Sequence, residues 1–124
     1  MSAELRNLLT DIRTDLGGDF VATDIVGMDG MSIAGQKARS EFNSDIVAAH
    51  FTMVMKLAGK VSEKMDLGTV KENQVNTGSV MVFSRILGNG SFFWLLATTN
   101  NATLGMVRAL MSEYEMRLLR AIPS

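Results

Sequence analysis

The sequence contains no cysteine, which excludes disulfide bonds, thiolate chemistry and metal sites built from thiolates. This absence favours a reducing, cytoplasmic setting. Histidine is almost as scarce, because His50 is the only one and no HExxH-type spacing surrounds it. A packed or interfacial role is the favoured interpretation of His50, and we expect neither a metal nor a cofactor.

An excess of charge of one sign is also missing. Twelve Lys and Arg against thirteen Asp and Glu leave a formal net charge of −1, whereas proteins that bind nucleic acids usually carry a basic excess. The longest uninterrupted apolar run, residues 92–97, is far too short to span a bilayer. The N-terminal residues lack the basic region and apolar block of a signal peptide. We therefore expect no nucleic-acid partner and no membrane insertion.

Motifs of common enzymes are absent as well. The chain has no Gly-x-Ser-x-Gly elbow and no phosphate-binding loop of the Gly-x4-Gly-Lys-Ser type. Its carboxylates are scattered rather than paired. Asp24 interrupts an apolar stretch, and a half-exposed strand beside Thr23 is the expected explanation. The sequence therefore predicts no catalytic residue and a protein that is not an enzyme.

Hydrophobic periodicity predicts the order helix, two strands, helix, three strands, helix within one domain, residues 1–124. We expect helices over residues 3–16, 44–65 and 104–121, a loop over 35–43, and strands over residues 20–26, 31–34, 69–75, 79–87 and 91–99. The economical packing is an α+β fold, in which helices cover both faces of a mostly antiparallel five-stranded sheet. The apolar strand 91–99 should be central, and the polar strand 69–75 should be an edge.

The second helix has a wider apolar arc than a sheet requires. The stripe expected to cover the sheet consists of Val47, Phe51, Val54, Ala58, Val61 and Met65. Ile46, His50, Met53 and Leu57 extend it, and with Met55 included the apolar arc reaches roughly 200° of the helix surface. We predict that these four residues form the seam of a two-fold dimer. The alternative is that a loop or another helix of the same chain covers them.

The edge strand gives a second expectation for the dimer. Two copies of the 69–75 strand can satisfy each other's backbone groups in antiparallel register. The predicted interface therefore also includes Val70, Glu72, Asn73 and Val75. A low strip of small or adaptable residues on the outward rim of the second helix is the predicted partner site, and it consists of Ala48, Thr52, Met55 and Gly59 beside Lys56. The alternative for this strip is a plain solvent-exposed helix face.

Two segments resemble the roadblock/dynein-light-chain family. Residues 23–34, TDIVGMDGMSIA, are similar to the first hairpin of that family. Residues 95–108, LLATTNNATLGMVR, are similar to its last strand and the start of its final helix. The family's Asn before Leu-Gly is Thr103 here, and Thr also caps helices. The order and spacing of elements match over essentially the whole chain, and the length resembles the stand-alone prokaryotic type.

The resemblance implies a homodimer that joins edge strands into one sheet, with the second helices side by side. It implies binding of motor subunits in eukaryotes and, for bacterial and archaeal members, pairing with small Ras-like GTPases, some as activating proteins. We therefore expect a non-enzymatic regulator or scaffold of such a GTPase. The alternatives are a signalling sensor that holds a small ligand, for which Asp24, His50 and Arg85 are the only candidate polar groups, and a structural subunit of a larger assembly.

Overall fold

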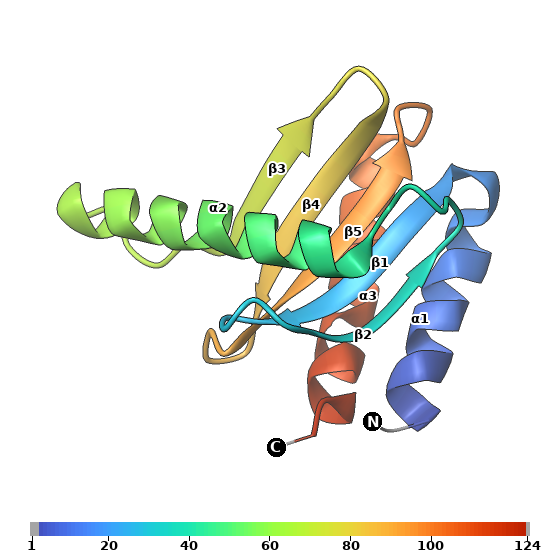
Figure 1. Cartoon of the computed structure of the whole chain (residues 1–124), viewed down its shortest axis with the longest axis horizontal. Coiled ribbons are helices and arrows are strands. Elements are labelled where there is room, and N and C mark those ends of the chain that lie inside the picture. Colours follow the sequence, from blue (N-terminus) through green and yellow to red (C-terminus); the bar gives the residue numbers. More distant parts are fainter. Residues whose placement is uncertain (1–2, 124) are drawn as a thin grey trace.

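The computed structural model describes residues 3–123 and has the expected order of helices and strands, which confirms the α+β class. Within these residues the elements are α1 (Ala3–Leu16), a short 3-10 turn (Gly17–Asp19), β1 (Phe20–Gly27), β2 (Ser32–Lys37), α2 (Ser44–Lys64), β3 (Glu72–Asn76), β4 (Val80–Leu87), β5 (Phe92–Thr99) and α3 (Leu104–Ala121). α1 and α3 lie on one face of the sheet, and α2 crosses the other face (Figure 1).

The five strands form an antiparallel sheet in the order β2-β1-β5-β4-β3. The central position of β5 is confirmed, because its apolar residues are buried on both faces. The edge position of β3 is confirmed too, although the strand starts at Glu72 rather than at residue 69. The loop expected over 35–43 is wrong for its first three residues, because β2 continues to Lys37 through pairing of Gly35 with Asp24.

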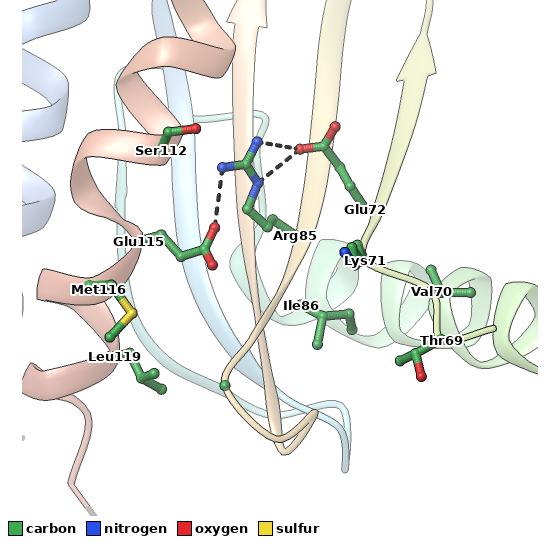
Figure 2. Close-up of a pocket in the computed structure, with 11 residues that line it drawn as sticks. Thr69, Val70, Lys71, Glu72, Arg85, Ile86, Ser112, Glu115, Met116 and Leu119 are labelled. Atoms are coloured by element: carbon green, nitrogen blue, oxygen red, sulfur yellow. Dashed lines mark hydrogen bonds and ion pairs between the residues drawn. The ribbon is translucent and has the colours of Figure 1, made fainter.

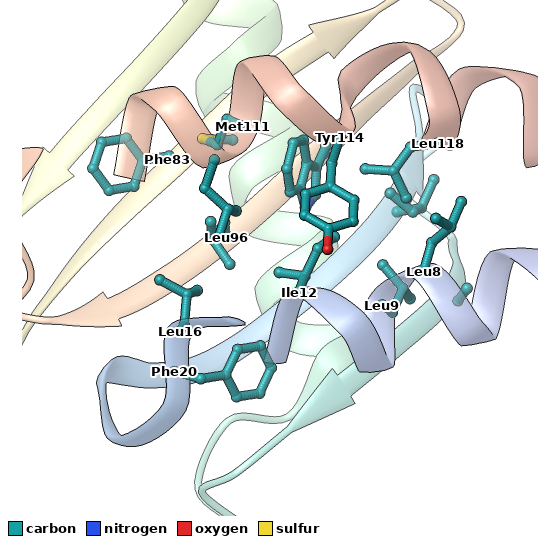
Figure 3. Close-up of a cluster of buried hydrophobic side chains, with 14 of the residues drawn as sticks. Leu8, Leu9, Ile12, Leu16, Phe20, Phe83, Leu96, Met111, Tyr114 and Leu118 are labelled. Atoms are coloured by element: carbon teal, nitrogen blue, oxygen red, sulfur yellow. The ribbon is translucent and has the colours of Figure 1, made fainter. Parts of the chain in front are cut away.

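The core is divided between the two faces of the sheet. Beneath α1 and α3, large side chains such as Phe83, Trp94 and Tyr114 fill the space between helices and sheet (Figure 3). The Trp94 Nε1–H donates to Thr23 Oγ1 at 2.8 Å, and that hydroxyl donates to the Leu95 carbonyl oxygen at 2.9 Å. Buried polar groups on this face are thus satisfied rather than left to destabilise the core.

The opposite face is packed by the smaller side chains of α2. Ala48, Thr52 and Met55 point to the sheet and are 0%, 4% and 2% exposed. The Thr52 hydroxyl donates to the Ala48 carbonyl oxygen at 2.7 Å, so it is satisfied within the helix. Small residues at this contact allow the helix axis to approach the strands closely.

The predicted orientation of α2 is therefore wrong by about a quarter turn. The stripe expected to cover the sheet is divided, because Val47 and Phe51 are half-buried and pack against this core, whereas Val61 and Met65 are exposed. Its members are Val47, Phe51, Val54, Ala58, Val61 and Met65. The physical reason is that the apolar arc is wider than the contact with the sheet, so only part of it faces inward.

Asp24 is buried beneath the start of α2, so its interpretation as a half-exposed strand residue is also wrong. Its side chain is 3% exposed, and the Ser32 hydroxyl donates to Asp24 Oδ1 at 2.9 Å. Across the strand pair, a Cβ on Gly35 would lie only 2.1 Å from Asp24 Oδ1, so the carboxyl occupies the space that a side chain at 35 would need.

Burial raises the pKa of Asp24 from 3.8 to about 6. Hydrogen bonds from Ser32 and Ser44 oppose this shift, and so does the charge of Lys37, whereas the charge of Asp45 adds to it. Because the folded state holds this proton more tightly than the unfolded chain, the contribution of Asp24 to stability is fully present below pH 3.8 and is lost as the pH rises through about 6.

We therefore expect Asp24→Asn to raise the free energy of unfolding at pH 7 by roughly 2 kcal/mol, because the buried charge disappears. The difference in the free energy of unfolding between the variant and the wild type should shrink at pH 5 and vanish near pH 4. Urea unfolding of both proteins at these pH values, at one protein concentration, measures the difference. An advantage that is independent of pH would contradict the assignment of a buried, titrating Asp24.

Candidate dimer and partner interface

α2 is a long helix with well-defined ends. The Asn43 side chain caps its start, where Oδ1 accepts from the backbone N–H of Asp45 at 3.0 Å and of Ile46 at 3.1 Å. At the other end, Asp66 adopts a left-handed conformation with φ of 55° and turns the chain back toward β3. The helix runs across the strands and continues past β3, beyond the edge of the sheet (Figure 1).

A continuous apolar surface covers the side of α2 that faces away from the sheet. Three predicted seam residues, Ile46, Met53 and Leu57, are 58%, 67% and 64% exposed. His50 lies between them and is exposed, with Nδ1 2.8 Å from the Ile46 carbonyl oxygen. The exposed apolar residues that sequence reasoning assigned to the core extend this surface, namely Val54, Val61 and Met65. Contiguous apolar surface of this kind is typical of an interaction site.

The predicted strand residues lie at the free edge of the sheet. β3 has β4 as its single neighbour among the described strands, and its Asn73 and Val75 are half-buried. Val70 lies in the segment before β3 and packs against the α2-side core. Among the residues that the structure describes, the Asn73 Oδ1 and Ser84 Oγ atoms are buried without a hydrogen-bond partner, and these two residues face each other across β3 and β4.

The strip predicted to bind a partner is not a surface of this chain. Ala48, Thr52 and Met55 are the residues that α2 buries against the sheet, and Gly59 on the same side is half-buried. Lys56 alone of the predicted set is exposed. The small residues that indicated close approach of a partner in fact permit close approach of the sheet. The size difference between the two sides of the apolar arc is the signal that identifies them.

A cleft of about 620 Å³ lies on the other face of the sheet, between α3 and the β3–β4 edge (Figure 2). At its polar end, Arg85 Nη2 is 2.8 Å from Glu72 Oε1, and Arg85 Nη1 is 3.2 Å from Glu115 Oε1. Its apolar end is lined by Val70, Ile86, Met116 and Leu119. The three side chains considered for a ligand are not brought together, because Asp24 lies under α2, His50 on its outer side and Arg85 in this cleft.

Two further features are absent from residues 3–123. Nowhere in this range do three or more His, Cys, Asp or Glu side chains gather closely enough to hold a metal ion. No helix in this range is both long and apolar enough to cross a membrane.

The sequence matches no protein-family model and no curated protein. Solved structures nevertheless share its fold. Myxococcus xanthus MglB is similar with a TM-score of 0.86 and 12% identity, over 95% of this chain and 94% of that one. A structure described as MglB with tetrameric arrangement is similar with a TM-score of 0.83 and 13% identity, over 98% of this chain and 91% of that one. A Roadblock/LC7 domain from Streptomyces avermitilis is similar with a TM-score of 0.77 and 16% identity, over 91% of this chain and 90% of that one. The expected roadblock fold is therefore confirmed.

The placement of Ala48 leads to a test with a neighbouring control. Ala48→Arg should destabilise the fold by about 3 kcal/mol or more, because a guanidinium would be forced into the closed contact between α2 and the sheet. Ala49→Arg, on the exposed side of the same turn, should change stability by less than about 0.5 kcal/mol. Thermal unfolding followed by circular dichroism compares the two. Equal stability of both variants would mean that α2 is rotated relative to the sheet from the orientation described.

Proposed function

We propose that this chain, with its roadblock/LC7 fold, acts in the cytoplasm as a non-enzymatic homodimeric regulator or scaffold that binds a small Ras-like GTPase. The observation that carries the proposal is the exposed apolar surface of α2, with Ile46, Met53 and Leu57 more than half exposed. A soluble chain rarely leaves such residues contiguous on one helix without a partner. The class of partner comes from the resemblance of residues 23–34 and 95–108 to roadblock proteins.

A second copy of the chain fits this surface and the β3 edge together. A two-fold axis beside β3 would join the two sheets through antiparallel β3 strands. Each α2, which extends past its own β3, would then lie over the sheet of the other protomer and beside its copy. Val70, Glu72, Asn73 and Val75 would lie at the strand junction, and Ile46, His50, Met53 and Leu57 would contribute to the helix seam.

The GTPase would dock on the paired α2 helices. Because the strip of small residues is buried, Lys56 is the residue of the predicted site that remains accessible. It lies on a charged flank of α2 together with Lys60 and Glu63. A charged rim beside an apolar seam is the usual anatomy of a protein interface. Acceleration of GTP hydrolysis and simple scaffolding are both compatible with this geometry.

A sensor domain is the second candidate function, and the cleft beside Arg85 is the observation that favours it. Its volume lies in the range of small-molecule sites. Arg85, however, already contacts two carboxylates of the same chain, which satisfies its charge without a ligand. A structural subunit is the third candidate, supported by the tetrameric arrangement named for one similar protein.

Substitution of a seam residue tests the dimer. Leu57→Asp should yield monomers, because an unpaired charge in a desolvated seam costs about 3 kcal/mol or more. Lys60→Asp, which places the same charge on the exposed charged flank of the helix, should leave the dimer intact. Sedimentation velocity at matched protein concentrations distinguishes the monomer from the dimer for each variant. If Leu57→Asp sediments as the wild type does while remaining folded, α2 does not form the seam.

Calorimetry with purified candidate GTPases tests the partner. We expect binding to depend on whether the GTPase carries GDP or a GTP analogue, because nucleotide state changes its switch segments. Lys56→Glu should weaken this binding without altering the dimer. Absence of binding to every Ras-like GTPase encoded by the same genome, in both nucleotide states, would rule out the proposed partner class and leave the dimer untouched.

A further inference from the structure

The side chains of β3 that point away from α2 form an unbroken polar chain along the whole strand. They are Glu72, Gln74 and Asn76, which alternate along one face. Arg108 Nη2, from α3, lies 3.3 Å from Glu72 Oε2 and donates to Gln74 Oε1 at 3.2 Å. The Gln74 amide then donates to Asn76 Oδ1 at 2.8 Å. One arginine atom therefore contacts two successive positions on the same face of the edge strand.

A second link connects the same strand to α3 through β4. The other carboxylate oxygen, Glu72 Oε1, accepts from Arg85 Nε at 2.9 Å, and Arg85 Nη1 donates to Glu115 Oε1 at 3.2 Å. Figure 2 shows Arg85 lying between the carboxylates of Glu72 and Glu115. Both oxygens of Glu72 are thus held by arginines, one from the neighbouring strand and one from the helix. Glu72 is the point at which β3, β4 and α3 meet.

α3 is a firm support for these contacts. Arg108 and Glu115 are seven residues apart, so they project from the same side of the helix toward β3. The other side of α3 is buried in the core, where Val107, Met111 and Leu118 are fully enclosed. A helix anchored by its core face cannot follow movements of the edge strand, so it restrains them.

We infer that Arg108, supported by the Arg85–Glu115 link, is a positioning residue that holds β3 in the extended form needed to pair with its copy. This inference rests on the proposed dimer. Without these polar contacts, β3 would lose backbone freedom when it pairs with a second copy. That loss of conformational entropy would weaken dimerisation. The polar chain orders the strand before the second copy arrives. Its role is separate from stability, because Arg108 is half exposed and lies outside the core.

The test compares dimer dissociation constants from sedimentation equilibrium for the wild type and four variants. Arg108→Ala should raise the constant roughly three- to tenfold, because β3 must then be ordered on association. Arg108→Lys should recover part of the loss, because an ammonium group can still contact Glu72. Arg120→Ala, which removes an exposed arginine elsewhere on α3, should behave as the wild type. Gln74→Pro should abolish the dimer, because the Gln74 backbone N–H faces the free edge, whereas those of Asn73 and Val75 bond to β4.

Two additional measurements separate positioning from a purely structural role. The melting temperature of monomeric Arg108→Ala, recorded under dilute conditions, should equal that of the monomeric wild type. Hydrogen exchange of the Asn73 and Val75 amides, which bond to β4, should be faster in the variant monomer, whereas exchange in β5 should not change. High salt should weaken the wild-type dimer more than the Arg108→Ala dimer, because exposed ionic contacts are screened.

The outcomes distinguish this inference from the function on which it rests. An unchanged dissociation constant for Arg108→Ala, with the dimer abolished by Gln74→Pro, overturns the positioning role and leaves the dimer standing. A wild type that is monomeric at all concentrations overturns both. A loss of melting temperature in proportion to the loss of dimer affinity also overturns the inference, because Arg108 would then act through general stability.

Discussion

The close contact between α2 and the sheet is the constraint on which the other features of this protein depend. Ala48, Thr52 and Met55 bring the helix onto the strands, and their small or flexible side chains leave no room for a bulkier residue. Once that side of the helix is fixed inward, the apolar residues on the opposite side of the helix must face outward. The exposure of Ile46, Met53 and Leu57 is therefore a consequence of packing inside the chain, and it creates the surface that a second molecule can cover.

The order of elements could be predicted from the sequence, because period and turn residues are local properties. The central position of β5 and the edge position of β3 could also be predicted, since an apolar run needs cover on both faces and a polar strand does not. The orientation of α2 could not. A helical wheel shows that the apolar arc is wide, but the part that faces the sheet depends on the separation between layers, which only the assembled core defines.

The same limit applies to the candidate site. The outward-facing seam residues were correctly placed on the surface of α2, whereas the partner strip was placed on the wrong side by the same quarter turn. Burial of Asp24 could not be predicted either, because it depends on the register that sets Gly35 opposite and Ser32 nearby. The three similar structures described above share only 12–16% of their residues with this chain. At that distance the pattern of layers is kept, and individual interface residues must be argued from this chain alone.

The contact between Asp24 and Gly35 also constrains how the sequence can change over time. A Cβ at position 35 would lie 2.1 Å from Asp24 Oδ1, so replacement of Gly35 requires the Asp24 carboxyl to move from its buried place. A smaller residue at position 24 removes the closest obstruction at position 35 and leaves the Thr23 carbonyl oxygen, at 3.2 Å, as the nearest neighbour of a Cβ there. The two positions should therefore covary among homologues. A buried acid that costs stability at neutral pH is in this way tied to the edge strand β2, and its replacement opens that strand to variation.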